Sequence, residues 1–249
     1  DGTLMSADFV ERYPVLTFAS GPTNSMRGAA RLGGHETAMV ADIGGTTTDF
    51  GWLAGGFPRE SSVSVDVGGV RTNFRMPDIY ALGLGGGSRV VEQDGDVAIG
   101  PGTDIAVAAG YAEIGDRDRV AHLDPALVER CVTRIHDMVA GGVDRMKTSA
   151  EPVPLILVGG GAVLINRDIP GTTEVIVPGH AGVANAIGAS IAQIGGETDR
   201  VFSYEQSGRE AALAAARAEA CERAVAAGAR PDSIVVIDLE ELPLTTLSP

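Results

Sequence analysis

Cysteine, aromatic residues and long apolar runs are all scarce in this sequence. Only two of the 249 residues are cysteines, and Cys131 and Cys221 lie far apart, outside any Cys-x-x-Cys pattern. Isolated cysteines of this kind are typical of buried thiols in a reducing compartment, so we expect a cytoplasmic protein. No apolar run reaches the roughly 18 residues that a membrane-spanning helix needs, and no signal-peptide pattern is present, which predicts no membrane partner.

Positive charge is scarce as well. Lysine and arginine number 19 against 33 aspartate and glutamate residues, a formal net charge of −14, and the basic residues form no stripe. A nucleic-acid partner is therefore not expected, because a phosphate backbone requires a basic surface. Aromatic residues make up 4% and hydrophobic residues 44% of the chain, so the core must consist mainly of Ala, Val, Ile and Leu. The length permits one large domain or two small ones.

Glycine, in contrast, is abundant, with 34 residues. Three runs each follow an apolar stretch: Gly44-Gly45, Gly85-Gly86-Gly87 and Gly159-Gly160-Gly161. In an α/β sheet, loops at the carboxyl ends of strands converge on one crevice, so the three runs together predict a nucleotide site. None of them matches the P-loop pattern or the context of the dinucleotide-binding fingerprint.

The first run lies in the most informative stretch of the chain, residues 42–49, which predicts a β-hairpin. An apolar strand over 37–43 precedes the run, and alternating apolar residues from Phe50 follow it. The two glycines let the backbone approach a ligand and direct its N–H groups at an anion, and Thr46 and Thr47 add hydroxyl donors. Asp42 and Asp49 offer hard oxygens for Mg²⁺ or a positioned water. The alternative is a plain turn that only requires glycine, with Asp42 capping it.

The remaining pattern alternates strands with helices and predicts an α/β fold whose sheet begins with antiparallel hairpins. A helix from Asp124 has an aspartate N-cap followed by proline, Gly141-Gly142 weakens its last turns, and His136 is expected on its surface. Expected strands span residues 15–19, 61–67, 70–74, 89–92, 96–99, 153–158, 175–178 and 233–239, and expected helices span 24–32, 124–147, 182–194 and 210–227. Residues 100–119 are expected to form a loop.

Several of these motifs carry a resemblance to the actin-like ATPase superfamily, which includes actin, sugar kinases and heat-shock ATPase chaperones. Residues 42–49, Asp-Ile-Gly-Gly-Thr-Thr-Thr-Asp, resemble its second phosphate motif, and residues 158–162 resemble its adenosine motif. Residues 20–30 and 182–190 resemble its two hinge helices. The resemblance implies a ribonuclease H-like lobe, with a mixed sheet flanked by helices.

Within that superfamily the chain resembles the hydantoinase/oxoprolinase family. Its members show Ser-Gly-Pro, a small-residue helix, Asp-x-Gly-Gly-Thr-x-Thr-Asp and then Gly-x-Gly-Gly-Gly-Ser, here residues 20–22, 28–29, 42–49 and 83–88, and a Gly-Pro at 100–101 also fits. Many members carry a histidine where this chain has Tyr80, so the resemblance transfers no catalytic or metal-binding histidine to this position. The roles of Asp78, Tyr80 and His180 stay open.

The family resemblance implies an ATP-dependent hydrolase of cyclic amides such as hydantoins, lactams or oxoproline. ATP would phosphorylate the amide oxygen and so activate the carbon for water. Asp42 and Asp49 would be catalytic, with Asp42 holding Mg²⁺ through water. The nucleotide would be bound by Gly44, Gly45, Thr46, Thr47, Gly85, Gly86, Gly87, Ser88, Gly159, Gly160 and Gly161.

An actin-like ATPase needs two lobes, and this chain shows one Asp-x-Gly-Gly-Thr motif. We therefore expect residues 1–200 to be the second lobe and residues 201–249 a carboxyl-terminal α/β extension. The partners would be a missing amino-terminal lobe, a cyclic-amide substrate and a second subunit, and the isolated chain would be inactive. A nucleotide-switched chaperone or enzyme reactivase is the main alternative, and a kinase is a third.

Overall fold

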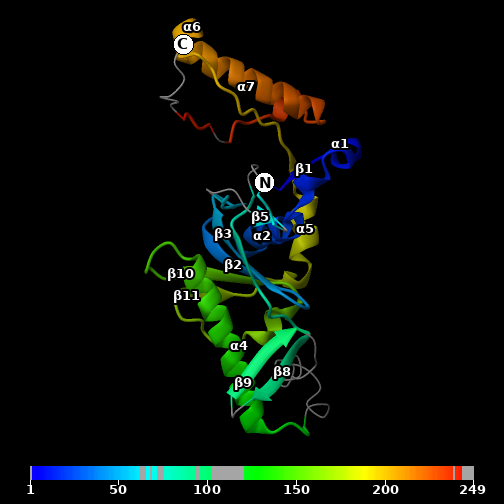
Figure 1. Ribbon diagram of the computed structural model, residues 1–249, viewed down its shortest axis with the longest axis vertical. Coiled ribbons are helices and arrows are strands. Elements are labelled where there is room, and N and C mark those ends of the chain that lie inside the picture. The colour runs from blue at the N-terminus through cyan, green and yellow to red at the C-terminus, as the bar shows by residue number, and fades with distance from the viewer. Residues whose placement is uncertain are drawn as a thin grey trace. The chain divides into compact units, whose positions relative to one another are not determined.

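The computed structural model describes residues 2–61, 66–67, 69–71, 76–93, 96–101, 121–237 and 239–242 (Figure 1). The chain divides into two compact units. The first comprises Asp1–Gly2 with Val15–Ala192, and the second comprises Thr3–Pro14 with Gln193–Pro249. The boundary expected at residue 200 stays a prediction.

A six-stranded mixed sheet forms the centre of the first unit. Its order is β11-β10-β2-β3-β4, and β7 also pairs with β3. The strands are β2 (Ala38–Ile43), β3 (Thr48–Ala54), β4 (Phe57–Pro58), β7 (Ile79–Leu82), β10 (Val153–Val158) and β11 (Thr172–Ile176). β10 runs parallel to β2 and β11, whereas β3 is antiparallel to β2, β4 and β7. The predicted α/β class, with antiparallel pairs early in the chain, is confirmed.

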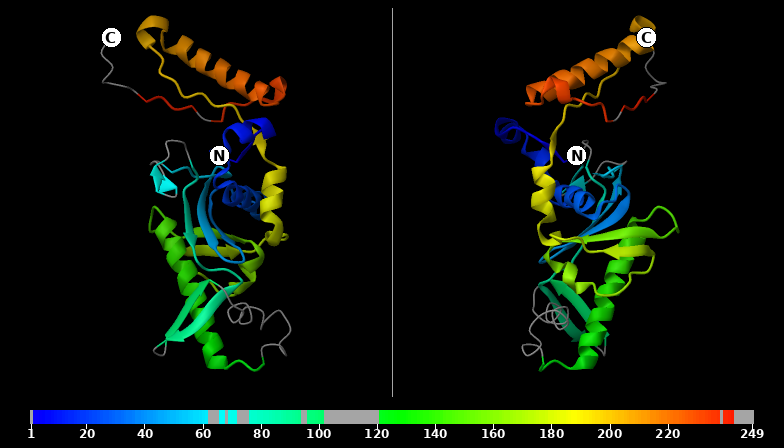
Figure 2. Two further views of the ribbon diagram at one scale, coloured as in Figure 1. Left: turned by 45° about the vertical axis from the view of Figure 1, so that its right-hand side comes forward. Right: turned by 180° about the vertical axis from the view of Figure 1, so that it is seen from behind.

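Helices cover both faces of this sheet (Figure 2). Helix α4 (Pro125–Met146) packs on one face over alternate residues of the strands, with Phe50, Leu155 and Ile135 in its core. Helix α2 (Ser20–Gly33) packs on the other face, where Met26, Val40 and Ile156 are buried. The strand expected over 153–158 is confirmed as β10, a near-continuous apolar run whose side chains enter both cores, as is typical of a strand covered on both faces.

Helix α2 packs closely against α5 (Ala184–Ser190), as its small residues predict. A Cβ on Gly28 would overlap the carbonyl oxygen of Ala184, and one on Gly188 would overlap that of Asn24. The side chain of Asn185 donates to the carbonyl oxygen of Gly21 at 2.8 Å. The helix begins at Ser20, so the helix predicted from residue 24 was too short at its amino-terminal end. The Ser-Gly-Pro segment forms its first turn, where proline needs no N–H partner.

Helix α4 begins as predicted. Asp124 accepts a hydrogen bond from the backbone N–H of Ala126 at 3.1 Å. The helix continues through the glycine pair to Met146, and Gly142 lies directly against the ring of Phe50. The weakening of the last turns by this pair stays a prediction. The surface position expected for His136 was wrong: its Nδ1 lies 2.7 Å from the carbonyl oxygen of Val132, and its Nε2 accepts from the N–H of Asn166 at 3.2 Å. Both ring nitrogens are satisfied inside the protein, so this histidine is structural.

The secondary structure expected for three segments was wrong. Residues 15–19 form the 3₁₀ helix η1 (Pro14–Thr17) instead of a strand. The helix expected over 182–194 ends at Ser190, after the 3₁₀ turn η4 (Ala181–Val183) that precedes α5. No strand forms in the described part of 233–239, where η5 (Pro231–Ser233) leads into exposed Val235 and Ile237. A β-branched run pairs only where another strand is within reach.

The strands expected over 89–92 and 96–99 are confirmed as β8 (Ser88–Gln93) and β9 (Asp96–Pro101), which pair antiparallel. The turn between them at 94–95 lies outside the described residues, as do most of the expected loop at 100–119 and parts of the expected strands at 61–67 and 70–74. The described parts of those two expected strands form β5 (Asp66–Val67) and β6 (Val70–Arg71), an antiparallel pair.

The second unit contains helices α1 (Ala7–Arg12), α6 (Tyr204–Ser207) and α7 (Arg209–Ala226), and strands β1 (Thr3–Leu4) and β12 (Gln193–Ile194) pair parallel. The helix expected over 210–227 is thereby confirmed as α7. Within the described residues of this unit, the buried apolar side chains are Ala212 and Ala224. None of the described helices of the chain combines the length and apolarity needed to cross a membrane.

Candidate functional site

The tip of the β2–β3 hairpin presents backbone donors to solvent. The N–H of Gly44 donates to the carbonyl oxygen of Thr47 at 2.8 Å and closes the turn. Gly45, Thr46 and Thr47 are exposed. Within the described residues, their three N–H groups and the two threonine hydroxyls have no hydrogen-bond partner. These unpaired donors at one tip suit an anion.

The second glycine run packs against this tip and holds two of its carbonyl groups. The N–H of Gly86 donates to the carbonyl oxygen of Gly44 at 2.9 Å, and the N–H of Gly87 donates to that of Gly45 at 2.7 Å. A Cβ at Gly85 would lie 2.5 Å from the backbone nitrogen of Thr46 and 2.6 Å from the carbonyl carbon of Gly45. Real Cβ atoms do not approach a backbone this closely, so only glycine fits at position 85.

The third glycine run follows β10 and lies against the other side of the hairpin. Since β10 pairs with β2, Val158 lies beside Asp42, and the chain turns directly after it. Gly159 has a φ of +85°, and a Cβ there would overlap the carbonyl oxygen of Ile43 and the Oδ1 of Asp42. A Cβ on Gly161 would lie 3.0 Å from the carbonyl oxygen of Gly44, whereas one on Gly160 would meet nothing within 4 Å. Gly160 is therefore the residue of this run with free space beside its Cα.

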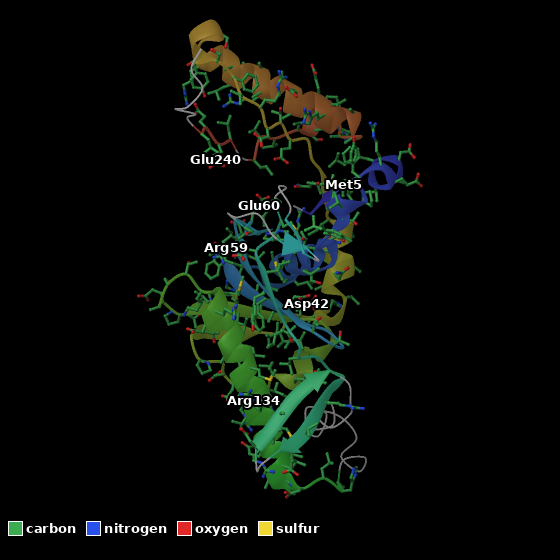
Figure 3. All side chains as sticks on the ribbon, in the orientation of Figure 1. Met5, Asp42, Arg59, Glu60, Arg134 and Glu240 are labelled. Atoms are coloured by element: carbon green, nitrogen blue, oxygen red, sulfur yellow. The ribbon has the colours of Figure 1, made fainter. Side chains whose placement is uncertain are left out.

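The two acids of the motif lie opposite each other across the hairpin, where β2 and β3 pair Asp42 with Asp49 (Figure 3 labels Asp42). Both are half-buried. Burial raises the pKa of Asp49, and the neighbouring charge of Asp42 raises it further. Among the described residues, no three Asp, Glu, His or Cys side chains cluster closely enough to hold a metal by themselves. A cation here would need ligands beyond these two side chains.

The structure thus brings all the predicted site residues to one end of the sheet. Gly44, Gly45, Thr46 and Thr47 form the tip, Asp42 and Asp49 lie just below it, and the glycines at 85–87 and 159–161 flank it. Ser88 is fully buried, and its Oγ accepts from the N–H of Gly85 at 2.8 Å. Sequence reasoning did not anticipate that the second run would contact the hairpin itself, because one glycine run shows no sign of what fills the space beside it.

The residues whose roles stayed open have different surroundings. Asp78 forms an ion pair at 2.6 Å with Arg59, the residue that follows β4 and is labelled in Figure 3. Tyr80 stacks on Phe50, and the guanidinium of Arg145 lies over its ring. His180 is exposed and has a left-handed φ of +67°. The carbonyl oxygen of the next residue, Ala181, accepts from the N–H of Gly159 at 3.0 Å, so His180 adjoins the third glycine run in the structure.

An α/β sheet in which glycine-rich loops converge around an exposed, donor-rich hairpin is typical of phosphate-binding proteins. Comparison with known proteins matches part of the chain to a family. Residues 1–116 match the family described as hydantoinase/oxoprolinase. This match confirms the resemblance seen in the motifs of this part of the chain. No curated protein matches the sequence.

Two solved structures share the fold. A nucleotide-free acetone carboxylase, from a study of ATP-dependent acetone carboxylation, is 16% identical with a TM-score of 0.54 over 87% of this chain. The ATP-dependent caprolactamase from Pseudomonas jessenii is 19% identical with a TM-score of 0.59 over 84% of this chain. The matches span 40% and 39% of those two chains, so this chain corresponds to about two fifths of each.

Proposed function

We propose that this chain is the second nucleotide-binding lobe of an ATP-dependent hydrolase that opens cyclic amides. The observation that carries the proposal is the convergence of three glycine runs around one hairpin tip beside a pair of aspartates. The family match and the ATP dependence of the two structural neighbours support it. The actin-like ATPase architecture belongs to this proposal.

The hairpin tip would bind the β- and γ-phosphates. The exposed N–H groups of Gly45, Thr46 and Thr47 are available for phosphate oxygens, and backbone donors that are already oriented stabilise charge as it develops on the transferred phosphoryl group. The glycine run at 159–161 would lie under the adenosine. Gly160 in this run has no side chain, and no other atom lies within 4 Å of the position that its Cβ would take.

A magnesium ion fits this donor set. Mg²⁺ commonly takes one or two carboxylates and completes its shell with water and substrate phosphates. Asp42 and Asp49 supply two carboxylates next to the tip, and the described residues offer no larger cluster. Asp42 would hold the ion through water, and the bound ion would neutralise the charge on the phosphates.

The reaction would begin with transfer of the γ-phosphoryl group of ATP to the amide oxygen. This transfer releases ADP. One water then adds to the activated carbon, and the ring C–N bond breaks as the nitrogen takes up a proton, which leaves an acyl phosphate. A second water hydrolyses the acyl phosphate to carboxylate and phosphate. Within this chain, the tip would orient the phosphoryl group, and Asp42 and Asp49 would hold the metal-bound water in place. The cyclic amide and the amino-terminal lobe would come from the rest of a longer protein, in line with the two-fifths coverage of the structural neighbours. A second subunit is also part of this proposal.

The test uses the longer protein that contains this lobe, assayed for ATP hydrolysis with and without hydantoin, 5-oxoproline or caprolactam. We expect one of these rings to stimulate hydrolysis, and Asp42→Asn to lower the stimulated rate roughly 100-fold or more. Asp144→Asn, at an exposed position of α4, is the matched control and should leave the rate unchanged. The isolated chain should bind MgATP weakly, without steady turnover, in isothermal titration.

Other outcomes would contradict the proposal. Stimulation by a protein partner alone, with no response to any ring, would indicate a nucleotide-switched chaperone or reactivase. Equal rates in the Asp42→Asn and Asp144→Asn variants would remove Asp42 from the site. Sub-micromolar affinity with steady turnover by the isolated chain would overturn the two-lobe assignment.

A further inference from the structure

The loop at residues 83–88 contacts the phosphate-binding tip through backbone atoms. Two hydrogen bonds join the loop to the tip, from Gly86 to Gly44 and from Gly87 to Gly45. Both use the carbonyl side of a tip peptide. The acceptors are the peptide groups that link residue 44 to 45 and residue 45 to 46.

A trans peptide points its C=O and its N–H in opposite directions. When Gly86 and Gly87 hold the carbonyl oxygens of Gly44 and Gly45, the N–H groups of Gly45 and Thr46 must point away from the loop. These are two of the exposed donors without a partner among the described residues. The loop therefore determines which way the tip presents its donors.

The loop is itself held by buried groups. The Oγ of Ser88 accepts from the N–H of Gly85, and the N–H of Ser88 donates to the carbonyl oxygen of Gly85 at 3.0 Å, which closes the loop on itself. The Oγ1 of Thr48 donates to the carbonyl oxygen of Leu84 at 2.7 Å. Both hydroxyl-bearing side chains are fully buried. β7, which enters the loop, pairs with β3, so the hairpin and the loop share one framework.

We propose that Gly85–Ser88 is a positioning element for the phosphate-binding tip, in place of the direct nucleotide contact expected from the sequence. The loop holds two peptide groups of the tip in the orientation that binds phosphate oxygens, and Thr48 anchors the loop to β3. This inference rests on the proposed phosphate-binding role of the tip.

The experiment compares the affinities of the chain for MgATP and for adenosine, followed by the amide signals of Gly45 and Thr46 in NMR titrations. Gly85→Ala, Ser88→Ala and Thr48→Val should each lower the ratio of ATP to adenosine affinity, by about 10-fold for Gly85→Ala and about 3-fold for the other two. Adenosine affinity should stay within 2-fold of wild type, because the third glycine run is untouched. A purely structural defect would weaken both ligands together.

Gly83→Ala is the matched control. It lies in the same loop, a Cβ there meets nothing within 4 Å, and its affinity ratio should remain that of wild type. Ser88→Ala and Thr48→Val keep the test open if Gly85→Ala fails to fold, since each removes one hydroxyl without adding bulk. A wild-type ratio in both of these folded variants would overturn the inference. Failure of the wild-type chain to show any phosphate-dependent affinity would instead contradict the proposed function.

Discussion

The two faces of the central sheet differ most at the end of the β2–β3 hairpin. On the α4 face, Ala41, Ile43 and Phe50 are fully buried up to the last residue of β2. On the α2 face, Val40 is buried, but the next residue on that face, Asp42, is half-exposed and lies opposite Asp49. Side chains alternate along a strand, so one pair of strands provides an apolar anchor on one face and a charged site on the other.

This difference indicates how the site can be polar without loosening the fold. The apolar residues that anchor the end of the hairpin alternate with the acids along the same two strands, one residue away. Ala41, Ile43 and Phe50 anchor this end on the α4 face, and the acids are not part of that apolar cluster. Substitutions that exchange the properties of the two faces therefore test the comparison directly.

The largest effect is expected when an amide side chain is placed on the anchored face. Ile43→Asn removes a fully buried apolar side chain and leaves a polar group among apolar neighbours, and we expect it to cost about 4 kcal/mol of unfolding free energy or more. Asp42→Asn introduces the same side chain one residue earlier, on the other face, and should change stability by about 1 kcal/mol or less. Urea denaturation of both variants measures the difference. Similar losses for the two would show that the faces do not differ.

A smaller effect is expected from the glycine pair of α4, which tests how tightly the anchored face is packed. A Cβ on Gly142 would press into the ring of Phe50, so Gly142→Ala should destabilise the protein by about 1–3 kcal/mol. Gly141 meets nothing within 4 Å, and Gly141→Ala should stabilise it by about 0.5–1 kcal/mol, because alanine favours a helix over glycine. Thermal unfolding distinguishes the two signs. A stabilising Gly142→Ala would indicate that the ring of Phe50 moves aside at little cost.

The smallest effect concerns the acidic pair and depends on pH. Burial and Asp42 raise the pKa of Asp49 above its ordinary value of 3.8, so the folded protein keeps this proton to higher pH than the unfolded chain does. The stability from the protonated form is present below that ordinary value and is lost as pH rises through the folded-state value. Asp49→Asn should therefore be neutral at pH 3 and stabilising at pH 7.5, by roughly 0.2–1 kcal/mol for relief of a like-charge pair.

Urea unfolding of Asp49→Asn at both pH values provides the measurement, with the exposed Asp144→Asn as control. A difference from wild type that stays constant between pH 3 and 7.5 would show that burial and Asp42 do not perturb Asp49.

Local patterns predicted the elements whose causes lie within a few residues of sequence. Asp124 and the proline after it begin α4, Gly34 with a φ of +71° ends α2, and the apolar run at 153–158 is a central strand. Each depends on capping, on backbone conformation or on a continuous apolar pattern.

The failures concern features whose causes lie far away in sequence. The strand expected at residues 233–239 has no partner strand among the described residues, and Val235 and Ile237 are 76% exposed. The surface position expected for His136 was wrong because Asn166, thirty residues later, supplies one of its hydrogen bonds. Neither the missing partner nor the distant donor is visible in the local pattern.

The sequence by itself determined the α/β class, the β2–β3 hairpin and the presence and order of the three glycine runs. Only the tertiary structure decided what each run does. Gly45 faces open space, Gly85 faces the backbone of the hairpin, and Gly159 faces Asp42. The physical reason is that glycine has no side chain, which leaves space beside its backbone. The sequence shows which residues leave this space, and the folded chain decides whether a ligand or another part of the protein fills it.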